Sequence, residues 1–213
     1  MYCCLGAFCW LWPAYAQSSR QRDNPSHLQF EGLGTLANGD LQGVTRDRKL
    51  TDFEVAYRRT FMRRSAVVLD FKTAIVPLAI LREPFLTGTD TQALKNVPPA
   101  TETRRSFGLG AKPAGLVVSF LPRHRWQPFV EFDGGLLYFN RNVMSARAAQ
   151  FNFTGEGRVG LRFSIHNGDD LSAGYGYLHM SNGYTAHENP GMDAHALFFS
   201  YSIPFPRRAS AKH

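Results

Sequence analysis

Cysteine is scarce in this chain and confined to its start, since the three cysteines are Cys3, Cys4 and Cys9. If that segment is removed on export, no thiol remains, which excludes disulfide bonds and thiolate metal sites. The sequence also lacks any hydrophobic run of the roughly 20 residues that a membrane-spanning helix needs. Internal repeats and low-complexity tracts are absent too. These absences exclude disulfide scaffolds, helical membrane proteins and repeat arrays.

The first residues have the features of an export signal. Residues 1–12 are apolar, and Ala14-Tyr15-Ala16 is the small-x-small pattern of a signal-peptidase site, although no Lys or Arg precedes it. We therefore expect a signal peptide over 1–16, a polar leader over 17–27, a folded domain over 28–205 and a basic tail over 206–213. One domain suits this length.

The formal charge of +7 lies entirely after the expected signal peptide. Nucleic acid is the usual partner of a basic protein, but export argues against it, so we expect no nucleic-acid partner. Several arginines instead flank expected outer loops, where they would meet lipid phosphate groups. These are Arg104, Arg105, Arg141 and Arg147.

Apolar and polar residues alternate with a period of two, most clearly over 149–165. One face carries Phe151, Phe153, Val159, Leu161, Phe163 and Ile165. The other carries Gln150, Asn152, Thr154, Glu156, Arg158, Arg162 and Ser164. Bulky apolar residues opposite small or charged ones, over strands longer than usual, are typical of a transmembrane β-barrel with a polar lumen. The alternative is a soluble barrel that binds hydrophobic ligands, in which these phenylalanines would point inward.

The pattern predicts an all-β fold, an eight-stranded antiparallel transmembrane β-barrel. The expected strands are 28–36, 52–61, 65–79, 105–121, 126–140, 149–165, 169–182 and 193–203, with Pro77 at a strand end. After the first pair, short and long connections alternate, as in outer-membrane barrels with periplasmic turns and longer outer loops. We therefore expect export to the outer membrane of a Gram-negative-type bacterium. With both termini periplasmic, the loop 183–192 is extracellular.

The segment 177–193 contains the residue types of an acyl-transfer triad. His179 and Ser181 lie two residues apart, so in a strand their side chains share a face. A hairpin to the next strand brings Asp193 beside them. In such a triad the serine attacks, the histidine takes its proton and the acid orients the histidine. We therefore predict Ser181, His179 and Asp193 as catalytic residues at the outer-leaflet level, facing lipid.

Other readings of the same region are weaker. His179, His187 and His195 are spaced by eight residues over a loop and two strands, which is not a ligand pattern, so no metal site is predicted. Four tyrosines nearby would either line an acyl groove or, by the structural interpretation, form an interfacial aromatic girdle. They are Tyr138, Tyr175, Tyr177 and Tyr201.

The sequence resembles the lipid A 3-O-deacylases (PagL-like outer-membrane enzymes) over approximately residues 105–205. The resemblance rests on these motifs: Gln127-Pro128-Phe129 leading to Gly134-Gly135-Leu136-Leu137-Tyr138, Phe151-Asn152-Phe153, His179-x-Ser181-Asn182, and Asn189-Pro190-Gly191. It implies an eight-stranded barrel whose Ser-His-acid triad faces the bilayer and hydrolyses the acyl ester at position 3 of lipid A. It implies no metal and no organic cofactor.

The resemblance also implies roles for residues around the triad. His179 would be the base and Ser181 the nucleophile. The acid is Glu in the best-known members and Asp193 here, one methylene shorter, so Glu188 is an alternative acid. If the shorter acid is strained, Asp193→Glu should keep or raise activity. Asn189 and the N–H groups of the Asn182–Tyr184 turn, which includes Gly183, would stabilise the oxyanion, although Asn-Pro-Gly is also plain turn chemistry.

Two other functions fit the same features. A phospholipase would use the same triad on glycerophospholipid esters. A non-catalytic small outer-membrane barrel with a structural or adhesive role would carry Asp193 as the mark of a decayed site. Lipopolysaccharide is the expected substrate and the membrane the expected environment, whereas the sequence does not indicate an oligomeric state.

Overall fold

The computed structural model describes residues 26–45, 47–84 and 103–205. The predicted signal peptide 1–16, the leader up to residue 25 and the basic tail 206–213 lie outside the described residues. The barrel begins at Ser26, two residues earlier than expected, so the last two residues of the predicted leader belong to the first strand. In the described part of the chain, no helix is long and apolar enough to cross a bilayer.

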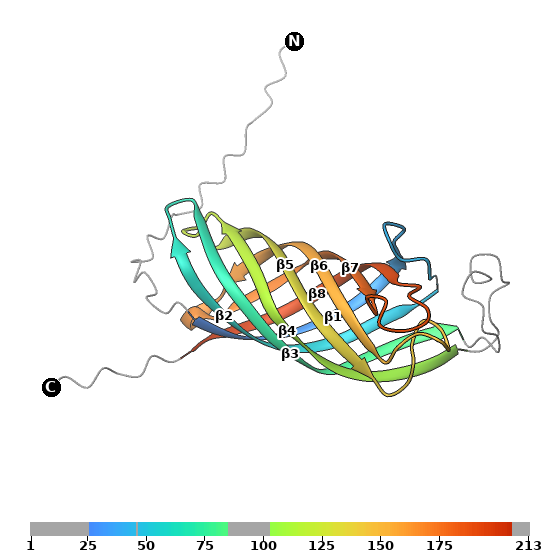
Figure 1. The fold of residues 1–213 in the computed structure, drawn as a ribbon. Coiled ribbons are helices and arrows are strands. Elements are labelled where there is room, and N and C mark those ends of the chain that lie inside the picture. Colours follow the sequence, from blue (N-terminus) through green and yellow to red (C-terminus); the bar gives the residue numbers. More distant parts are fainter. Residues whose placement is uncertain (1–25, 46, 85–102, 206–213) are drawn as a thin grey trace, which may run out of the picture.

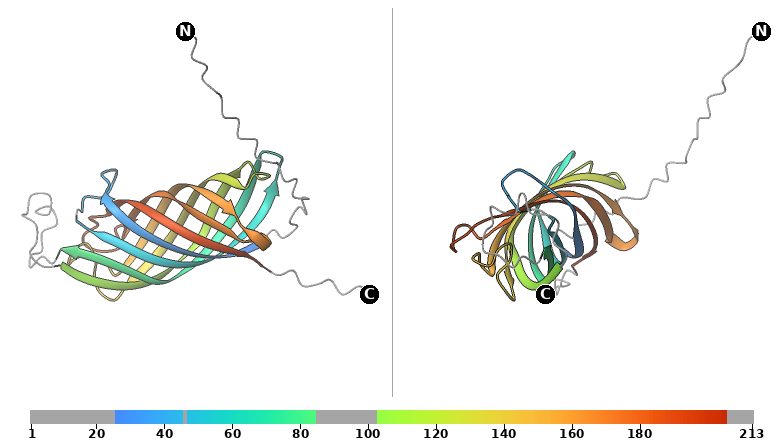
Figure 2. Two further views of the ribbon diagram at one scale, coloured as in Figure 1. Left: turned by 180° about the vertical axis from the view of Figure 1, so that it is seen from behind. Right: turned by 90° about the vertical axis from the view of Figure 1, so that its right-hand side faces the viewer.

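Eight antiparallel strands form a single closed barrel in which each strand pairs with its neighbours in sequence and the first pairs with the last. The strands are β1 (Ser26–Asn38), β2 (Lys49–Arg63), β3 (Val67–Pro84), β4 (Thr103–Phe120), β5 (Trp126–Phe139), β6 (Phe151–Ser164), β7 (Asp170–Ser181) and β8 (Met192–Pro204). Figure 1 shows them wound around one axis, and the right-hand view of Figure 2 shows the ring that they close. The predicted fold class is confirmed.

The two ends of the barrel differ in the length of their connections. The β2–β3, β4–β5 and β6–β7 connections are short turns, whereas the β1–β2, β5–β6 and β7–β8 connections are longer loops. The β1–β2 loop and the β7–β8 loop lie at the same end (Figure 1, blue and orange-red). We call it the loop end; the predicted triad residues lie there.

The outer surface carries the bulky apolar residues. Phe153 is 46% exposed, Phe199 57% and Tyr201 37%. Phe151 and Phe163 are half-buried by ring contacts with Phe153 and Trp126. The outward orientation predicted for these side chains is confirmed, and the soluble barrel with inward phenylalanines is excluded. An apolar outer band on a closed barrel is what a bilayer requires.

Pro77 of β3 and Pro113 of β4 lie at bulges inside their strands, which corrects the prediction that Pro77 ends a strand. The β3–β4 register shifts between Val76 and Ala79, around Pro77, and again around Pro113 of β4. Proline cannot donate a ladder hydrogen bond and is tolerated at such bulges. Each bulge reverses the phase: even-numbered residues of β3 are buried up to Val76, and odd-numbered ones from Ala79. The extra residue therefore concealed the last five residues of β3 from a strict period-two pattern.

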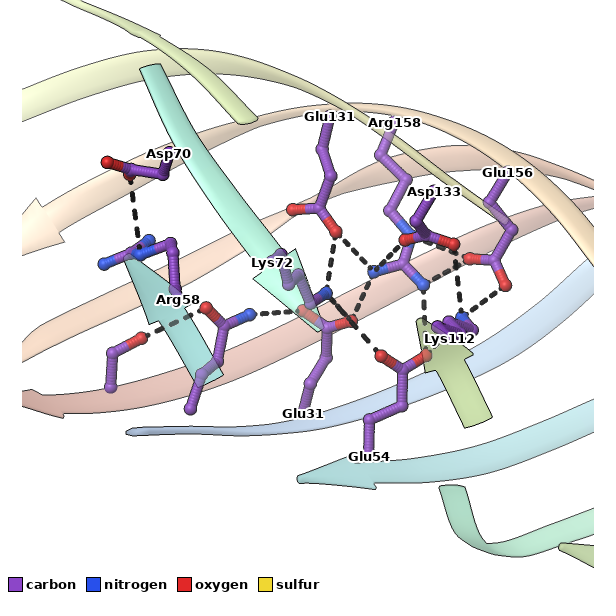
Figure 3. Close-up of polar contacts among 12 residues, drawn as sticks. Glu31, Glu54, Arg58, Asp70, Lys72, Lys112, Glu131, Asp133, Glu156 and Arg158 are labelled. Atoms are coloured by element: carbon purple, nitrogen blue, oxygen red, sulfur yellow. Dashed lines mark hydrogen bonds and ion pairs between the residues drawn. The ribbon is translucent and has the colours of Figure 1, made fainter. Parts of the chain in front are cut away.

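The middle of the lumen is filled by a charged network (Figure 3). Lys72 contacts Glu131 at 2.7 Å and Glu31 at 3.3 Å. Lys112 is hydrogen bonded to Glu54 and Glu156. Arg158, which is fully buried, contacts five acids: Glu31, Glu54, Glu131, Asp133 and Glu156. Paired charges satisfy one another where water is excluded.

Toward the loop end the lumen becomes apolar, whereas the sequence predicted a polar lumen. Buried residues of β2, β3, β5, β7 and β8 meet there, and Val143 and Met144 of the β5–β6 loop fold in over them. This cluster closes the lumen below the loops. Its members are Leu50, Val76, Ala79, Leu81, Leu137, Phe139, Val143, Met144, Leu178, Met180, Met192 and Ala194.

Candidate active site

The predicted triad residues lie where β7 ends and β8 begins. His179 and Asp193 are direct cross-strand partners, and Ser181 follows two residues later on the same face of β7. This face is the lipid-facing one, because Tyr175 on the same face is 42% exposed. The hairpin therefore brings the acid to the histidine from the adjacent strand, as the alternation of the two strands requires.

A short hydrogen bond joins the histidine and the acid. The Nδ1 atom of His179 lies 2.6 Å from Oδ1 of Asp193. The His179 side chain is 29% exposed, whereas the Asp193 side chain has no exposed surface. Because Nδ1 is engaged by the carboxylate, Nε2 is the ring nitrogen left to exchange a proton with another group.

Ser181 is half-buried beside this pair and has Phe153 of β6 as its cross-strand partner. Among the described residues, no hydrogen bond links its hydroxyl to His179. On the other side of β7, Gly155 is the cross-strand partner of His179, and a Cβ there would have no atom within 4 Å. The surface next to the histidine is thus open on the lipid side.

The β1–β2 loop covers Asp193 from outside the barrel. The backbone N–H groups of Gln42 and Gly43 both donate to Oδ2 of Asp193, at 2.5 and 2.9 Å. This is why an acid on the lipid-facing side of β8 is nevertheless buried. Sequence reasoning missed these donors, because residues 38–51 have no alternation and nothing in them indicates a contact with a strand about 150 residues away.

The β7–β8 turn is organised by two asparagines. The side-chain oxygen of Asn189 accepts a hydrogen bond from the Asn182 N–H at 2.9 Å, and the side-chain oxygen of Asn182 accepts one from the Tyr184 N–H at 3.0 Å. Asn182 is fully buried and also donates to the Glu188 carbonyl at 2.6 Å. Gly183 has a φ of 61°, a left-handed conformation that glycine adopts freely. Two of the three predicted oxyanion N–H groups are therefore engaged within the turn.

Glu188, the alternative acid, is directed elsewhere. Its carboxylate accepts a hydrogen bond from the Ser145 hydroxyl at 2.6 Å, and its N–H donates to the Arg147 carbonyl at 3.3 Å. These contacts tie the β7–β8 loop to the β5–β6 loop. The carboxylate at His179 Nδ1 is that of Asp193.

An aromatic group lies just below the His–Asp pair on the lipid-facing side. Tyr177 and His195 are cross-strand partners with their rings edge to face, 5.2 Å apart. His195 is hydrogen bonded through Nδ1 to the Tyr175 hydroxyl. His187, the third histidine of the rejected metal reading, is exposed on the β7–β8 loop.

Carboxylates that lie close enough together to hold a cation occur in the lumen, in the described part of the chain. Oxygen atoms of Asp52, Glu54 and Glu156 lie within 4.8 Å of one another. The ammonium group of Lys112 contacts two of these acids, Glu54 and Glu156, and supplies positive charge there. This group is inside the barrel and separate from the lipid-facing histidine.

Comparison with known proteins gives a family and a fold. Residues 82–202 match the family model described as lipid A 3-O-deacylase (PagL). A solved structure, the crystal structure of the outer membrane enzyme PagL, is 19% identical and covers 84% of this chain and 99% of its own, with a TM-score of 0.54. A second, the crystal structure of Neisserial surface protein A (NspA), is 10% identical over 85% of this chain and 97% of its own, with a TM-score of 0.46. Among curated proteins the comparison found no match.

Proposed function

Because this chain belongs to the lipid A 3-O-deacylase (PagL) family, we propose that it hydrolyses the ester-linked acyl chain at position 3 of lipid A. The observation that supports this most is the His179–Asp193 hydrogen bond of 2.6 Å beside Ser181 on the lipid-facing side of the barrel. A base held by an acid next to a hydroxyl is the arrangement of a serine esterase. Its position at the loop end suits a substrate in the outer leaflet of the outer membrane.

In the proposed reaction, the Ser181 oxygen attacks the ester carbonyl while Nε2 of His179 takes the hydroxyl proton. The tetrahedral intermediate collapses when His179 returns this proton to the departing 3-oxygen of the sugar, which leaves an acyl-serine. Water, deprotonated by the same nitrogen, then attacks the carbonyl of the acyl-serine. His179 returns that proton to the Ser181 oxygen as the bond to it breaks, which releases the fatty acid and restores the enzyme. The Asp193 carboxylate stays ionised throughout the reaction and stabilises the imidazolium form of His179.

The oxyanion is proposed to be stabilised by two donors from the β7–β8 turn. The oxygen of the Asn189 amide accepts from Asn182, so its nitrogen is the end left to donate. In the backbone of the turn, the Asn182 and Tyr184 N–H groups are engaged, which singles out Gly183. Removing one such donor commonly costs about 10²–10³-fold in kcat.

Arginines at the loop end suit the phosphate groups of lipid A. Arg105, Arg141 and Arg147 are exposed at the loop end, and Arg147 lies in the loop tied to Glu188. Arg104 does not support this role, because it contacts Glu83 at 2.8 Å. One exposed guanidinium group can donate two parallel hydrogen bonds to two oxygens of the same phosphate.

The test is mass spectrometry of lipid A from cells that express the protein or its Ser181→Ala variant. The proposal predicts loss of one ester-linked acyl chain with the wild type alone. Release of fatty acid from glycerophospholipid, with lipid A unchanged, would indicate a phospholipase instead. If purified wild-type protein in detergent leaves both lipids intact, the protein is a non-catalytic barrel.

A further inference from the structure

Residues 39–45 of the β1–β2 loop, which we call the acid clamp, lie along the start of β8. The Gly39 N–H donates to the Asp193 carbonyl at 2.8 Å, and the Val44 N–H donates to the Pro190 carbonyl at 2.9 Å. Thr45 forms an isolated parallel bridge with Met192. The clamp is therefore attached through its backbone to the segment that carries the acid.

The clamp also contacts the carboxylate itself. Gln42 and Gly43 donate their N–H groups to Oδ2 of Asp193, while Oδ1 faces His179. We propose that the acid clamp is a positioning element that orients the Asp193 carboxylate toward His179. This inference rests on the esterase function proposed above. Hydrogen bonds to a charged acceptor are stronger than neutral ones, so two of them restrict the carboxylate to one rotamer.

Glycine at position 43 is what permits this contact. A Cβ on Gly43 would lie 2.5 Å from the Asp193 nitrogen and 2.6 Å from the Met192 carbonyl carbon, both of them backbone atoms that cannot rotate away. Gly43 does not have a positive φ, in contrast to Gly183 and Gly191. The need for glycine is therefore steric, and a methyl group there would lift the clamp off β8.

Tyr177, which lies farther from the loop end than His179, contacts the same loop. Its hydroxyl accepts a hydrogen bond from the Leu41 N–H at 3.1 Å, and a Cβ on Gly39 would overlap its ring. Two glycines thus allow the loop backbone to pack closely on the site: Gly39 against the Tyr177 ring and Gly43 against the backbone at Asp193. The clamp compensates for the short acid, because it covers the aspartate and fixes its free oxygen.

The first experiment compares Gly43→Ala with Gly34→Ala in the purified full-length protein, with lipid A in detergent micelles as substrate. Gly34 is a matched control in β1, where an added Cβ would have no atom within 4 Å. Gly43→Ala should lower kcat by about 10- to 100-fold, the range of a lost charge-assisted hydrogen bond, and leave KM within about twofold. Gly34→Ala should behave like the wild type.

A double-mutant cycle with Asp193→Ala separates positioning from a general structural effect. If the clamp acts through the carboxylate, Gly43→Ala costs nothing further once the carboxylate is gone. The steric overlap with the β8 backbone remains in that background, so a merely structural effect would appear in both. Equal losses in both backgrounds would overturn the proposal.

A measurement independent of activity completes the test. In protein labelled with ¹⁵N-histidine, the Nδ1–H proton of His179 should give a downfield NMR signal that Gly43→Ala broadens or shifts and Gly34→Ala leaves unchanged. An unchanged signal in Gly43→Ala overturns the clamp, whatever the enzyme hydrolyses. Wild-type activity in Gly43→Ala, with Ser181→Ala inactive, overturns the clamp alone. If the wild type is inactive but Gly43→Ala shows the predicted NMR change, the esterase function is overturned and the contact of the clamp with the His179–Asp193 pair stands.

Discussion

At position 193 the chain carries an aspartate where the resemblance to the deacylase family implies a glutamate, and the structure places this shorter acid in a closed environment. Its side chain has no exposed surface, and both oxygens have partners, His179 on one side and the acid clamp on the other. The shorter side chain therefore leaves no empty space, because the backbone of the β1–β2 loop occupies the space that a longer acid would need.

This packing reverses the expectation drawn from the sequence for Asp193→Glu. An added methylene would push the carboxylate against the clamp or the imidazole, and overpacking of this kind costs about 1–3 kcal/mol. If that cost falls on the transition state, kcat decreases by about 5- to 160-fold. Lipid A hydrolysis by the purified variant measures it. Activity at or above the wild type would show that the site relaxes around a longer acid.

Ser181 and His179 should behave as one unit. Ser181→Ala and His179→Asn are each expected to remove nearly all hydrolysis, and the double variant should lose no more than either alone, because each removes the same activated nucleophile. Asp193→Asn should be milder than Ser181→Ala, because the acid orients the histidine and does not take the proton. Single-turnover assays at high enzyme concentration measure these residual rates. Additive losses would contradict a shared mechanism.

At the scale of an element, the outer face of β8 carries a covered site residue at one end and lipid-facing side chains in the middle. Asp193 at its start lies under the clamp, whereas Leu197, Phe199 and Tyr201 further along the same face are exposed on the outside of the barrel. The opposite face carries Ala194, Ala196 and Ser200, which are buried in the lumen. The same alternation thus defines a site at one end and a lipid-facing surface in the middle.

A charge in the middle of this surface should destabilise the barrel. Phe199→Arg is expected to cost about 2–4 kcal/mol, because the side chain would lie near the bilayer midplane. Phe61→Arg, near the short-turn end of β2 and 61% exposed, is the control and should cost about 0–1 kcal/mol. Urea unfolding of both variants in lipid vesicles measures the difference. Equal costs would mean that the two positions lie at the same depth.

For the whole molecule, the charged network of the lumen is the feature that joins strands from all sides. Arg158 of β6 reaches acids of β1, β2 and β5, namely Glu31, Glu54 and Glu131. Such contacts depend on closure, since β1 and β6 are not neighbours in the sheet. The network joins strands that are not neighbours in the sheet, and it lies apart from the lipid-facing site.

Arg158→Met should therefore affect stability more than catalysis. Without Arg158, the buried carboxylates keep only Lys72 and Lys112 as positive partners. The buried negative charge left without compensation costs about 3–5 kcal/mol. Arg59→Met, an exposed position on β2, is the matched control and should change stability by less than about 0.5 kcal/mol. Urea unfolding gives the free energy of unfolding, and lipid A hydrolysis by the folded fraction should stay within about twofold of the wild type. A large loss of kcat in folded Arg158→Met would couple the lumen to the site.

The sequence by itself determined those features that depend on local periodicity. Alternation with a period of two assigned faces to Phe153, Phe199 and His179, because successive side chains of a strand must point to opposite sides. The hairpin connection placed Asp193 beside His179 for the same reason. The closed eight-stranded fold followed from the count of such segments and from their alternating loop lengths.

The tertiary structure alone decided the rest. The bulges at Pro77 and Pro113 shift the phase within a strand, so a strict period could not follow β3 to its end. Arg158 pairs with Glu31 and Glu54, each more than 100 positions away in the sequence. Gly43 of the clamp contacts Asp193 over a similar separation. Such contacts arise only when β1 closes on β8, and no local pattern encodes which loop then covers which side chain.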